Sequence, residues 1–524
     1  MEHIELVVLF LLVTVAVLTA IARVLHLPYP ILLVIGGSLV GFAPGVPDVQ
    51  LEPDLVLLIF LPPLLFNAAY FSSVRDLRAH ARAITLTSIG LVLLTMCSVA
   101  LVAHAAIDGL PWAAAFALGA IVSPTDPLAA VAITRRLGVP RRINTVIEGE
   151  ALVNDGTALV AYRTAVSAAV GASFDLLDAT ADFVVNVAGG IAVGLAASVL
   201  IVAALRRLVG DDVVGVVTSL AAGYVAYIPA EQIGVSGVLA SVTVGLVVGY
   251  KSPALSTPAS RLRGYGFWEV LVFLLNAVLF VLVGLQLPGI LSEQDRSALE
   301  LIWLALLVSA VVIGTRLLWV NTTPFIIRAL DRRPSQLARR AGWQLRLVSG
   351  WSGLRGSVSL AAALALPHGF PERDLLIYLT LAVIFATLVG QGLTLPLLIR
   401  RLGVEDDGAG EREELLARRQ ATQAAIEHLQ RLHEEDWTRD DTIERMLQLY
   451  RFRDRRLTQR AGELDGDQED NLDERSVSYQ RMVREVLDAQ RRRVVELRNE
   501  GAISDEVMHL LERELDLEDQ RLEI

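Results

Sequence analysis

The stretch FALGAIVSPTDPLAAVAI, residues 116–133, is apolar enough to lie in a membrane, yet two prolines interrupt it. Pro124 and Pro127 bracket Thr125 and Asp126. A proline removes a backbone donor and clashes with the preceding helical turn. We therefore predict a transmembrane helix that breaks here, with Asp126 beside the partial charges of the two half-helix ends.

A second apolar stretch with a charged centre lies far down the chain. GWSGLRGSVSLAAALAL, residues 350–366, places Arg355 among three glycines, which weaken a helix in its middle. Two interrupted spans in corresponding positions are typical of transporters built from inverted repeats. Their unpaired backbone groups must face a cavity or be buried by protein, and we expect Asp126 and Arg355 to compensate the helix ends. Simple kinks without substrate contact are the alternative.

The composition indicates a membrane protein. Of the 524 residues, 53% are hydrophobic, against about 45–50% in soluble proteins even when glycine is counted. Apolar runs of about 18 residues or more recur, and each is long enough to cross a bilayer. The predicted fold is an all-α polytopic membrane protein with about thirteen transmembrane helices, two of them discontinuous. The predicted spans are 4–24, 28–44, 54–72, 83–105, 111–132, 143–168, 183–205, 212–229, 233–250, 266–290, 299–322, 344–366 and 374–399.

The loops between these spans differ in charge. Nearly all basic loop residues follow odd-numbered spans, including four arginines within residues 135–142. The opposite loops hold only Arg296 and Arg373 among the basic residues, together with acids. Basic loops stay in the cytoplasm. We therefore predict a multi-pass protein of the cell membrane with its N-terminus outside and its C-terminus in the cytoplasm.

The end of the chain differs in composition from the rest. Residues 405–524 hold 33 acidic and 20 basic side chains, whereas residues 1–404 hold 24 and 26. Apolar residues recur in the tail at helical spacing. We predict two domains, a transmembrane domain at 1–403 and a charged helical cytoplasmic tail at 404–524. We expect the tail to serve folding or dimer contacts. Regulation is the alternative, and the sequence does not distinguish between the two.

Three carboxylates stand close together in the sixth predicted span, IEGEALVNDGTALV, residues 147–160. Ionisable residues inside a span are costly and usually mark ion paths or internal ion pairs. Glu148 is near the cytoplasmic end, so we expect it at the interface. We expect Glu150 to pair with Arg316 of the eleventh span and to hold the two helices together.

This pairing leaves Asp155 without an arginine. A carboxylate without a counter-charge in a membrane can hold a proton, or a hard cation through its oxygens, but not both comfortably. That competition is the chemistry of a cation/proton antiporter. The alternative is a helix-packing residue that is protonated or bonded to an amide. Arg163, toward the outer end of the same span, is expected to reach the interface by extending its side chain.

Four motifs in order carry a resemblance to a known family. The sequence resembles the bacterial NhaP-type and eukaryotic NHE-type sodium/proton antiporters over essentially residues 1–400. The resemblance implies thirteen spans, a homodimer, a mobile six-helix core that moves against a dimerisation domain, and a role in pH homeostasis. The motifs are FLPPLLFNAAYFSS at 60–73, SPTDP at 123–127, GEALVNDGTA at 149–158 and GLRGSVSLAAAL at 353–364.

The resemblance also implies roles for individual residues. Asp155 would carry the cation and the proton, and Asn154 would orient the site. Thr125, through its backbone carbonyl, and Asp126 would complete a site for a monovalent cation. Members with an Asn-Asp pair, as here, are expected to be electroneutral and to exchange one cation for one proton.

Other positions match or depart from the family pattern. Glu150 and Arg316 match its conserved ion pair, and Arg355 matches the arginine of the second broken span. Ala151 stands where many members have a serine ligand, and Asn67 where several have an acid. Both departures remove an oxygen ligand or a charge, which leaves selectivity between Na⁺, K⁺ and Li⁺ open.

The predicted function is exchange of Na⁺, or of K⁺ or Li⁺, for H⁺ by alternating access, in a lipid membrane, without a cofactor and without nucleic acid. A K⁺-selective antiporter is one alternative. A cation channel would need a continuous polar pathway, and an organic-solute transporter would need a larger polar or aromatic pocket. An enzyme is not expected, because the sequence has no HExxH motif, nucleophile elbow or P-loop.

Overall fold

The regular structure is helical throughout the part of the chain that the computed structural model describes. The chain divides into two compact units, Met1–Asp406 and Asp407–Ile524. The described residues are 2–25, 28–43, 53–171, 176–207, 212–292, 296–330, 342–406, 408–435, 437–461 and 472–522.

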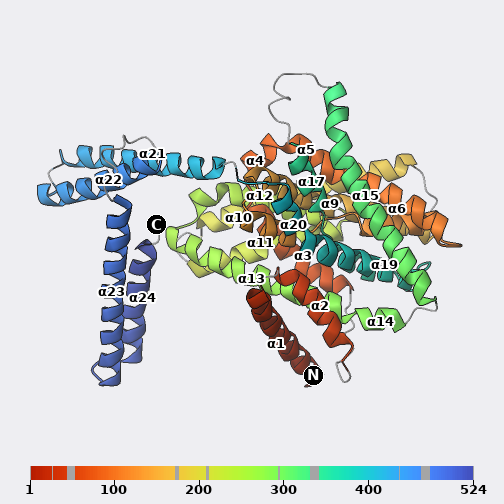
Figure 1. Ribbon diagram of the computed structural model, residues 1–524, viewed down its shortest axis with the longest axis horizontal. Helices are drawn as coiled ribbons and strands as arrows, with labels where there is room; N and C mark the ends of the chain where they lie inside the picture. Colours follow the sequence, from red (N-terminus) through yellow and green to blue (C-terminus); the bar gives the residue numbers. More distant parts are fainter. Residues whose placement is uncertain are drawn as a thin grey trace. The chain divides into compact units, whose positions relative to one another are not determined.

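The first unit is a bundle of apolar helices (Figure 1). Its helices are α1 (Glu2–Leu25), α2 (Tyr29–Gly41), α3 (Pro53–Tyr70), α4 (Val74–Ala79), α5 (Ala81–Thr85), α6 (Val92–Ala106), α7 (Trp112–Ile121), α8 (Pro127–Arg136), α9 (Arg141–Ala169), α10 (Leu176–Arg207), α11 (Asp212–Gln232), α12 (Gly237–Leu255), α13 (Pro258–Leu285), α14 (Leu287–Ser292), α15 (Ala298–Leu330), α17 (Trp343–Trp351), α18 (Ser357–Leu364), α19 (Arg373–Phe385) and α20 (Gly392–Arg401). Two π-helical turns, η1 (Leu86–Leu91) and η2 (Ala386–Gln391), join α5 to α6 and α19 to α20.

The length and apolar composition of its helices show that this unit is a polytopic membrane domain, as predicted. In the described residues, seven helical segments are long and apolar enough to cross a bilayer, and four shorter apolar helices accompany them. Large apolar side chains remain exposed on them, such as Leu299 at 80%, which suits contact with lipid. The count of thirteen spans stays a prediction. The seven segments are Ala81–Ala106, Ala181–Arg207, Asp212–Gln232, Gly237–Leu255, Pro258–Leu291, Ala298–Ile327 and Arg373–Arg401.

Both predicted helix breaks are present. α7 ends at Ile121 and α8 begins at Pro127, with non-helical backbone between them. α17 ends at Trp351 and α18 begins at Ser357, again across non-helical backbone. The prolines of the first break and the glycines of the second therefore act as the sequence predicts.

The buried apolar residues form two main clusters. One is built largely by α7, α8, α18 and α19, with residues of α9 and α15. The other joins α3 to α10, α11 and α12. α9 contacts α7 and α8, which belong to the first cluster, and α10 and α12, which belong to the second. The helix that carries the three acids therefore lies where the two clusters meet.

Small residues allow α2 and α13 to approach closely. A Cβ added at Gly284 of α13 would lie 2.4 Å from the carbonyl oxygen of Val34 and 2.5 Å from the backbone nitrogen of Ser38. A Cβ at Gly37 of α2 would lie 2.6 Å from the carbonyl oxygen of Val281. Close backbone approach at small residues is a usual means of joining helices in a membrane.

In its described residues, the second unit has four helices in two antiparallel pairs, α21 (Ala409–Leu432) with α22 (Asp440–Arg460) and α23 (Leu472–Asn499) with α24 (Asp505–Leu522) (Figure 1). Arg491 of α23 donates hydrogen bonds to Asp516 and Asp519 of α24 at 2.9 and 3.0 Å. The helical character predicted for the tail is confirmed.

The close approach of α2 and α13 generates a prediction for Gly284→Ala. The added methyl group meets backbone atoms that cannot rotate away, so we expect a loss of about 1–3 kcal/mol in stability and a lower melting temperature of the detergent-solubilised protein. Gly314→Ala is the control, since nothing lies within 4 Å of a Cβ there and alanine favours a helix by roughly 1 kcal/mol over glycine. Equal melting temperatures for the two variants would contradict the packing argument.

Candidate cation site

A cavity of about 450 Å³ lies among α3, α8, α9, α13 and α18. Asp155 of α9, together with Thr125 and Asp126 from the first helix break, lines it. Arg135 and Glu148 also line the cavity, and they form a partly exposed ion pair with an N–O distance of 2.6 Å. The cavity therefore connects the middle of α9 with the surface near Glu148, which agrees with the interfacial position expected for that residue.

The two helix breaks contact each other through their backbones. The Asp126 N–H donates to the carbonyl oxygen of Leu354 at 2.8 Å. The Asp126 side chain caps α8 by accepting from the Leu128 N–H at 2.9 Å. A Cβ at Gly356 would stand 2.0 Å from Asp126 Oδ2. Only glycine fits at position 356 without displacing the carboxylate, so the glycine of one break makes room for the acid of the other.

A buried arginine joins α9 to the second break. Arg316 of α15 forms an ion pair with Glu150 through two hydrogen bonds, and both side chains are 2% exposed. The same guanidinium donates to the carbonyl oxygens of Ser349 and Gly350, each at 3.2 Å. These carbonyls lie in the last turn of α17, where a helix leaves acceptors unpaired. Arg316 thus neutralises an acid and also caps a half-helix.

The hydroxyl group of Thr125 extends this network. It donates to Glu150 Oε1 at 3.1 Å and accepts from Asn154 Nδ2 at 2.7 Å. Asn154 is 1% exposed, and its Oδ1 has no hydrogen-bond partner in the described structure. The network therefore fixes the orientation of the Asn154 amide and leaves its Oδ1 atom without a partner in the described structure. Asn154 itself is not among the residues that line the cavity.

Asp155 differs from its two neighbouring acids. It is 8% exposed and lines the cavity. Within the described part of the chain, neither a cationic side chain nor a hydrogen-bond donor engages its carboxylate. Ala151 and Asn67 line the same cavity, so both departures from the family pattern face the space beside Asp155.

Arg355 occupies the centre of the second break. Its backbone N–H donates to Thr387 Oγ1 at 3.0 Å, from the π-helical turn η2. Its side chain is 1% exposed, and the Nε and Nη1 atoms have no hydrogen-bond partner in the described structure. It interacts electrostatically with Glu150 and Arg316. The positive charge therefore stays inside the protein, close to the buried ion pair.

Arg163, expected to extend alone toward the interface, forms an ion pair with Glu231 of α11. Glu231 Oε1 also accepts from the Gly237 N–H of α12 at 3.0 Å. Glu148 and Arg163 are 15 residues apart, roughly 22 Å along a helix. α9 is therefore tied to α11 and α12 at the end away from the cavity mouth.

Among the lining residues that the sequence analysis did not single out are three with polar side chains on other helices. They are Tyr29 of α2, Asn276 of α13 and Ser359 of α18. The Asn276 amide donates to the carbonyl oxygen of Val272 at 2.7 Å, which leaves its oxygen as an acceptor. The sequence alone did not indicate these residues. It does not show whether a single polar residue in an apolar helix lies on the face that lines the site.

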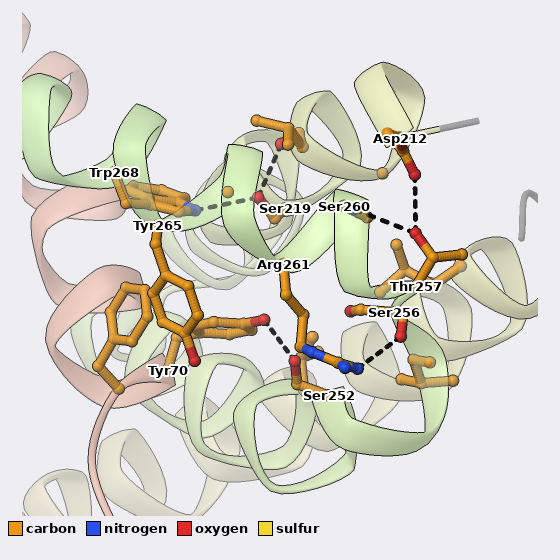
Figure 2. A pocket seen from close by; sticks show the side chains of 17 residues that line it. Tyr70, Asp212, Ser219, Ser252, Ser256, Thr257, Ser260, Arg261, Tyr265 and Trp268 are labelled. Carbon is orange, nitrogen blue, oxygen red and sulfur yellow. Dashed lines mark hydrogen bonds between the residues drawn. The ribbon is translucent and has the colours of Figure 1, made fainter. Parts of the chain in front are cut away.

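A second cavity of about 50 Å³ lies among α3, α11, α12 and α13 (Figure 2). Its polar groups are largely engaged with one another. The hydroxyl groups of Tyr70 and Ser252 share a hydrogen bond of 2.6 Å, and the Arg261 guanidinium donates to the carbonyl oxygen of Ser256 at 2.8 Å. The larger cavity, which holds the carboxylate without a partner, is therefore the stronger candidate for an ion site.

Comparison with known proteins shows which family the chain belongs to. The model of the family described as "Sodium/hydrogen exchanger, transmembrane" matches residues 9–401. An uncharacterized Na⁺/H⁺ exchanger of Mycobacterium tuberculosis is 36% identical over 98% of this chain and 96% of its own length. A sodium, potassium, lithium and rubidium/H⁺ antiporter of Bacillus pumilus is 33% identical over 76% of this chain and 61% of its own.

A solved structure shares the fold. The sodium/proton antiporter MjNhaP1 from Methanocaldococcus jannaschii matches with a TM-score of 0.61, over 77% of this chain and 99% of that one, at 18% identity. The sequence matches support the family assignment more strongly than the shared fold does, because they span the membrane domain with both of its helix breaks. The chain belongs to the sodium/hydrogen exchanger family.

Proposed function

We propose that this protein exchanges Na⁺ for H⁺ across the cell membrane, with Asp155 as the group that carries each in turn. The observation that carries the proposal is the Asp155 carboxylate, which lines a cavity and has no cation or donor among the described residues. A cation and a proton would compete for its oxygens. Binding of one therefore requires release of the other, which couples the two fluxes.

The surrounding residues would complete the site. Asp126 keeps Oδ2 available while Oδ1 caps α8. Asn154, which does not line the cavity, would orient the site through its hydrogen bond to Thr125. Thr125 would contribute its backbone carbonyl, because its hydroxyl is already bonded to Glu150. Glu150 and Arg316 would hold α9, α15 and α17 in register and bind no cargo, and Arg355 would compensate the helix ends of the second break.

Alternating access would move the site from one side to the other. The cavity reaches the surface near Arg135 and Glu148, on the side that the loop charges predict to be cytoplasmic. The far end of α9 is tied to α11 by Arg163 and Glu231. This state would be inward-facing, and the outward-facing state would require that ion pair to separate. We also propose the homodimer, the cytoplasmic C-terminus and a part in pH homeostasis on the strength of the family resemblance.

A K⁺-selective antiporter is the second candidate. Ala151 and Asn67 line the cavity and offer fewer oxygens and less charge than a serine and an acid would. The Bacillus pumilus relative is described as an antiporter of sodium, potassium, lithium and rubidium. Flux measurements with each cation separate the two candidates.

Asp155→Asn should abolish cation-driven proton movement, because the amide cannot bind a proton or neutralise a cation. In everted membrane vesicles, addition of Na⁺, K⁺ or Li⁺ should collapse a preformed pH gradient with the unmodified protein and not with the variant. Asp108→Asn, an exposed acid outside the cavity, is the matched control and should retain exchange. Exchange retained by Asp155→Asn would refute the assignment of the carrier.

Glu150→Gln should reduce folded yield, since it leaves Arg316 buried without its counter-charge. Breaking such a pair costs about 3–5 kcal/mol, which size-exclusion chromatography of the detergent-solubilised protein would register. Glu300→Gln is the control, because Glu300 is 44% exposed in its pair with Arg296 and surface pairs contribute about 0–1 kcal/mol. Normal yield with loss of transport would instead make Glu150 part of the transport machinery.

Exchange should be electroneutral, because a single carboxylate would carry one cation or one proton. In proteoliposomes containing the purified protein, the initial rate of Na⁺/H⁺ exchange should stay the same when a membrane potential of either sign is imposed. A rate that rises with one sign and falls with the other would show net charge movement and exclude one-for-one exchange.

A further inference from the structure

The side chain of Ser359 is a buried polar group in the wall of the large cavity. It belongs to the first turn of α18, is 1% exposed and lines the cavity that Asp126 and Asp155 also line. Its hydroxyl has no hydrogen-bond partner in the described structure. A buried hydroxyl without a partner costs free energy, so this group is expected to bind something that the described residues do not supply.

Several other buried hydroxyl groups in the membrane unit donate a hydrogen bond within their own helix. Ser38, Ser198 and Thr380 each donate to the carbonyl oxygen four residues earlier, at 2.9, 2.6 and 2.8 Å. For Ser359 the residue four positions earlier is Arg355, which lies in the non-helical break. The break therefore removes the acceptor that a serine in a continuous helix would use. Ser88 and Thr95 also lack partners, but neither lines the cavity.

The position of Ser359 places its hydroxyl near the proposed cargo. Gly356 is the residue directly before α18, three positions ahead of Ser359. Gly356 is in close contact with the Asp126 carboxylate. Ser359 therefore lies at the end of α18 that is next to the first break, and Gly356, Ser359 and Asp126 all line the cavity.

A cation in the cavity would use the lone pairs of the Ser359 oxygen, which has no hydrogen-bond partner in the described structure. Hard cations are held by several oxygen atoms. On α9, Ala151 lines the cavity without offering an oxygen. We propose that Ser359 is a cation-binding residue, and that its hydroxyl oxygen supplies from α18 the neutral ligand that position 151 lacks. The inference rests on the proposed exchange of Na⁺ for H⁺ at Asp155 and names a further ligand of that site.

The test compares Ser359→Ala with the unmodified protein in proteoliposomes. Loss of one oxygen ligand should raise the apparent KM for Na⁺ and Li⁺ by about fivefold to twentyfold, with a maximal rate within about twofold of the original. Ser359→Cys keeps a side chain of similar size but replaces the oxygen by a soft sulfur, so it should raise KM in the same way. Ser198→Ala, which removes a hydroxyl bonded to its own helix, is the matched control and should leave KM unchanged.

A second arm tests whether the two positions serve one cation. Adding Ala151→Ser to Ser359→Ala returns an oxygen to the cavity from α9, and should lower the raised KM toward its original value. A double variant that keeps the raised KM would contradict the inference that an oxygen at position 151 can replace the one at position 359. A single variant Ser359→Ala with unchanged KM for Na⁺ and Li⁺ would overturn the proposal itself.

A binding measurement separates this inference from folding and from the proposed function. Na⁺ that binds the folded protein raises its melting temperature, so Ser359→Ala should require a higher Na⁺ concentration for the same rise. Its folded yield should equal that of the unmodified protein, since no hydrogen bond is lost. If the unmodified protein shows no Na⁺-driven proton flux, the proposed function fails. If that flux depends on Asp155 but KM and Na⁺-induced stabilisation are unchanged in Ser359→Ala, only the role of Ser359 fails.

Discussion

The membrane domain is organised by the need to satisfy unwound backbone in an apolar medium. Water is scarce there, so each exposed N–H or C=O group requires a partner from the protein. The two breaks meet this need largely with each other and with a few side chains. The Asp126 N–H reaches the Leu354 carbonyl, the Arg355 N–H reaches Thr387, and Arg316 covers the carbonyls at the end of α17. Thr125 and Asp126, which line the cavity together with Asp155, therefore owe their positions to the contact between the two breaks.

The same constraint explains why similar acids in one helix have different surroundings. Glu150 is compensated by Arg316 and by the Thr125 hydroxyl, so its charge is neutralised inside the protein. Glu148 meets Arg135 near the surface. Asp155 receives no such partner among the described residues and faces the cavity. A site that has to release its cargo benefits from this arrangement, because a permanent internal cation would outcompete a transported one.

Some of this could be predicted from sequence, for definable reasons. Proline and glycine act on the backbone locally, so the breaks around Asp126 and Arg355 were visible without a structure. Glu150 and Arg316 stood out because few other charges fall in the middle of a span. The hydroxyl network of Thr125, the π-helical turn that brings Thr387 to Arg355 and the exposure of Ser359 to the cavity all depend on how helices rotate about their axes. An apolar helix carries little information on its rotation, because most of its faces are chemically alike.

The ion pair of Arg316 with Glu150 also has a consequence for biosynthesis. The two residues are 166 positions apart in the chain, which corresponds to roughly 8–30 s of translation at about 5–20 residues per second. During that interval α9 has been made, but the guanidinium that neutralises its acid has not. α9 therefore cannot reach its final environment until α15 arrives, and the last turn of α17 is capped later still. The order of synthesis therefore delays completion of the centre of the membrane domain until α15 and α17 have been made.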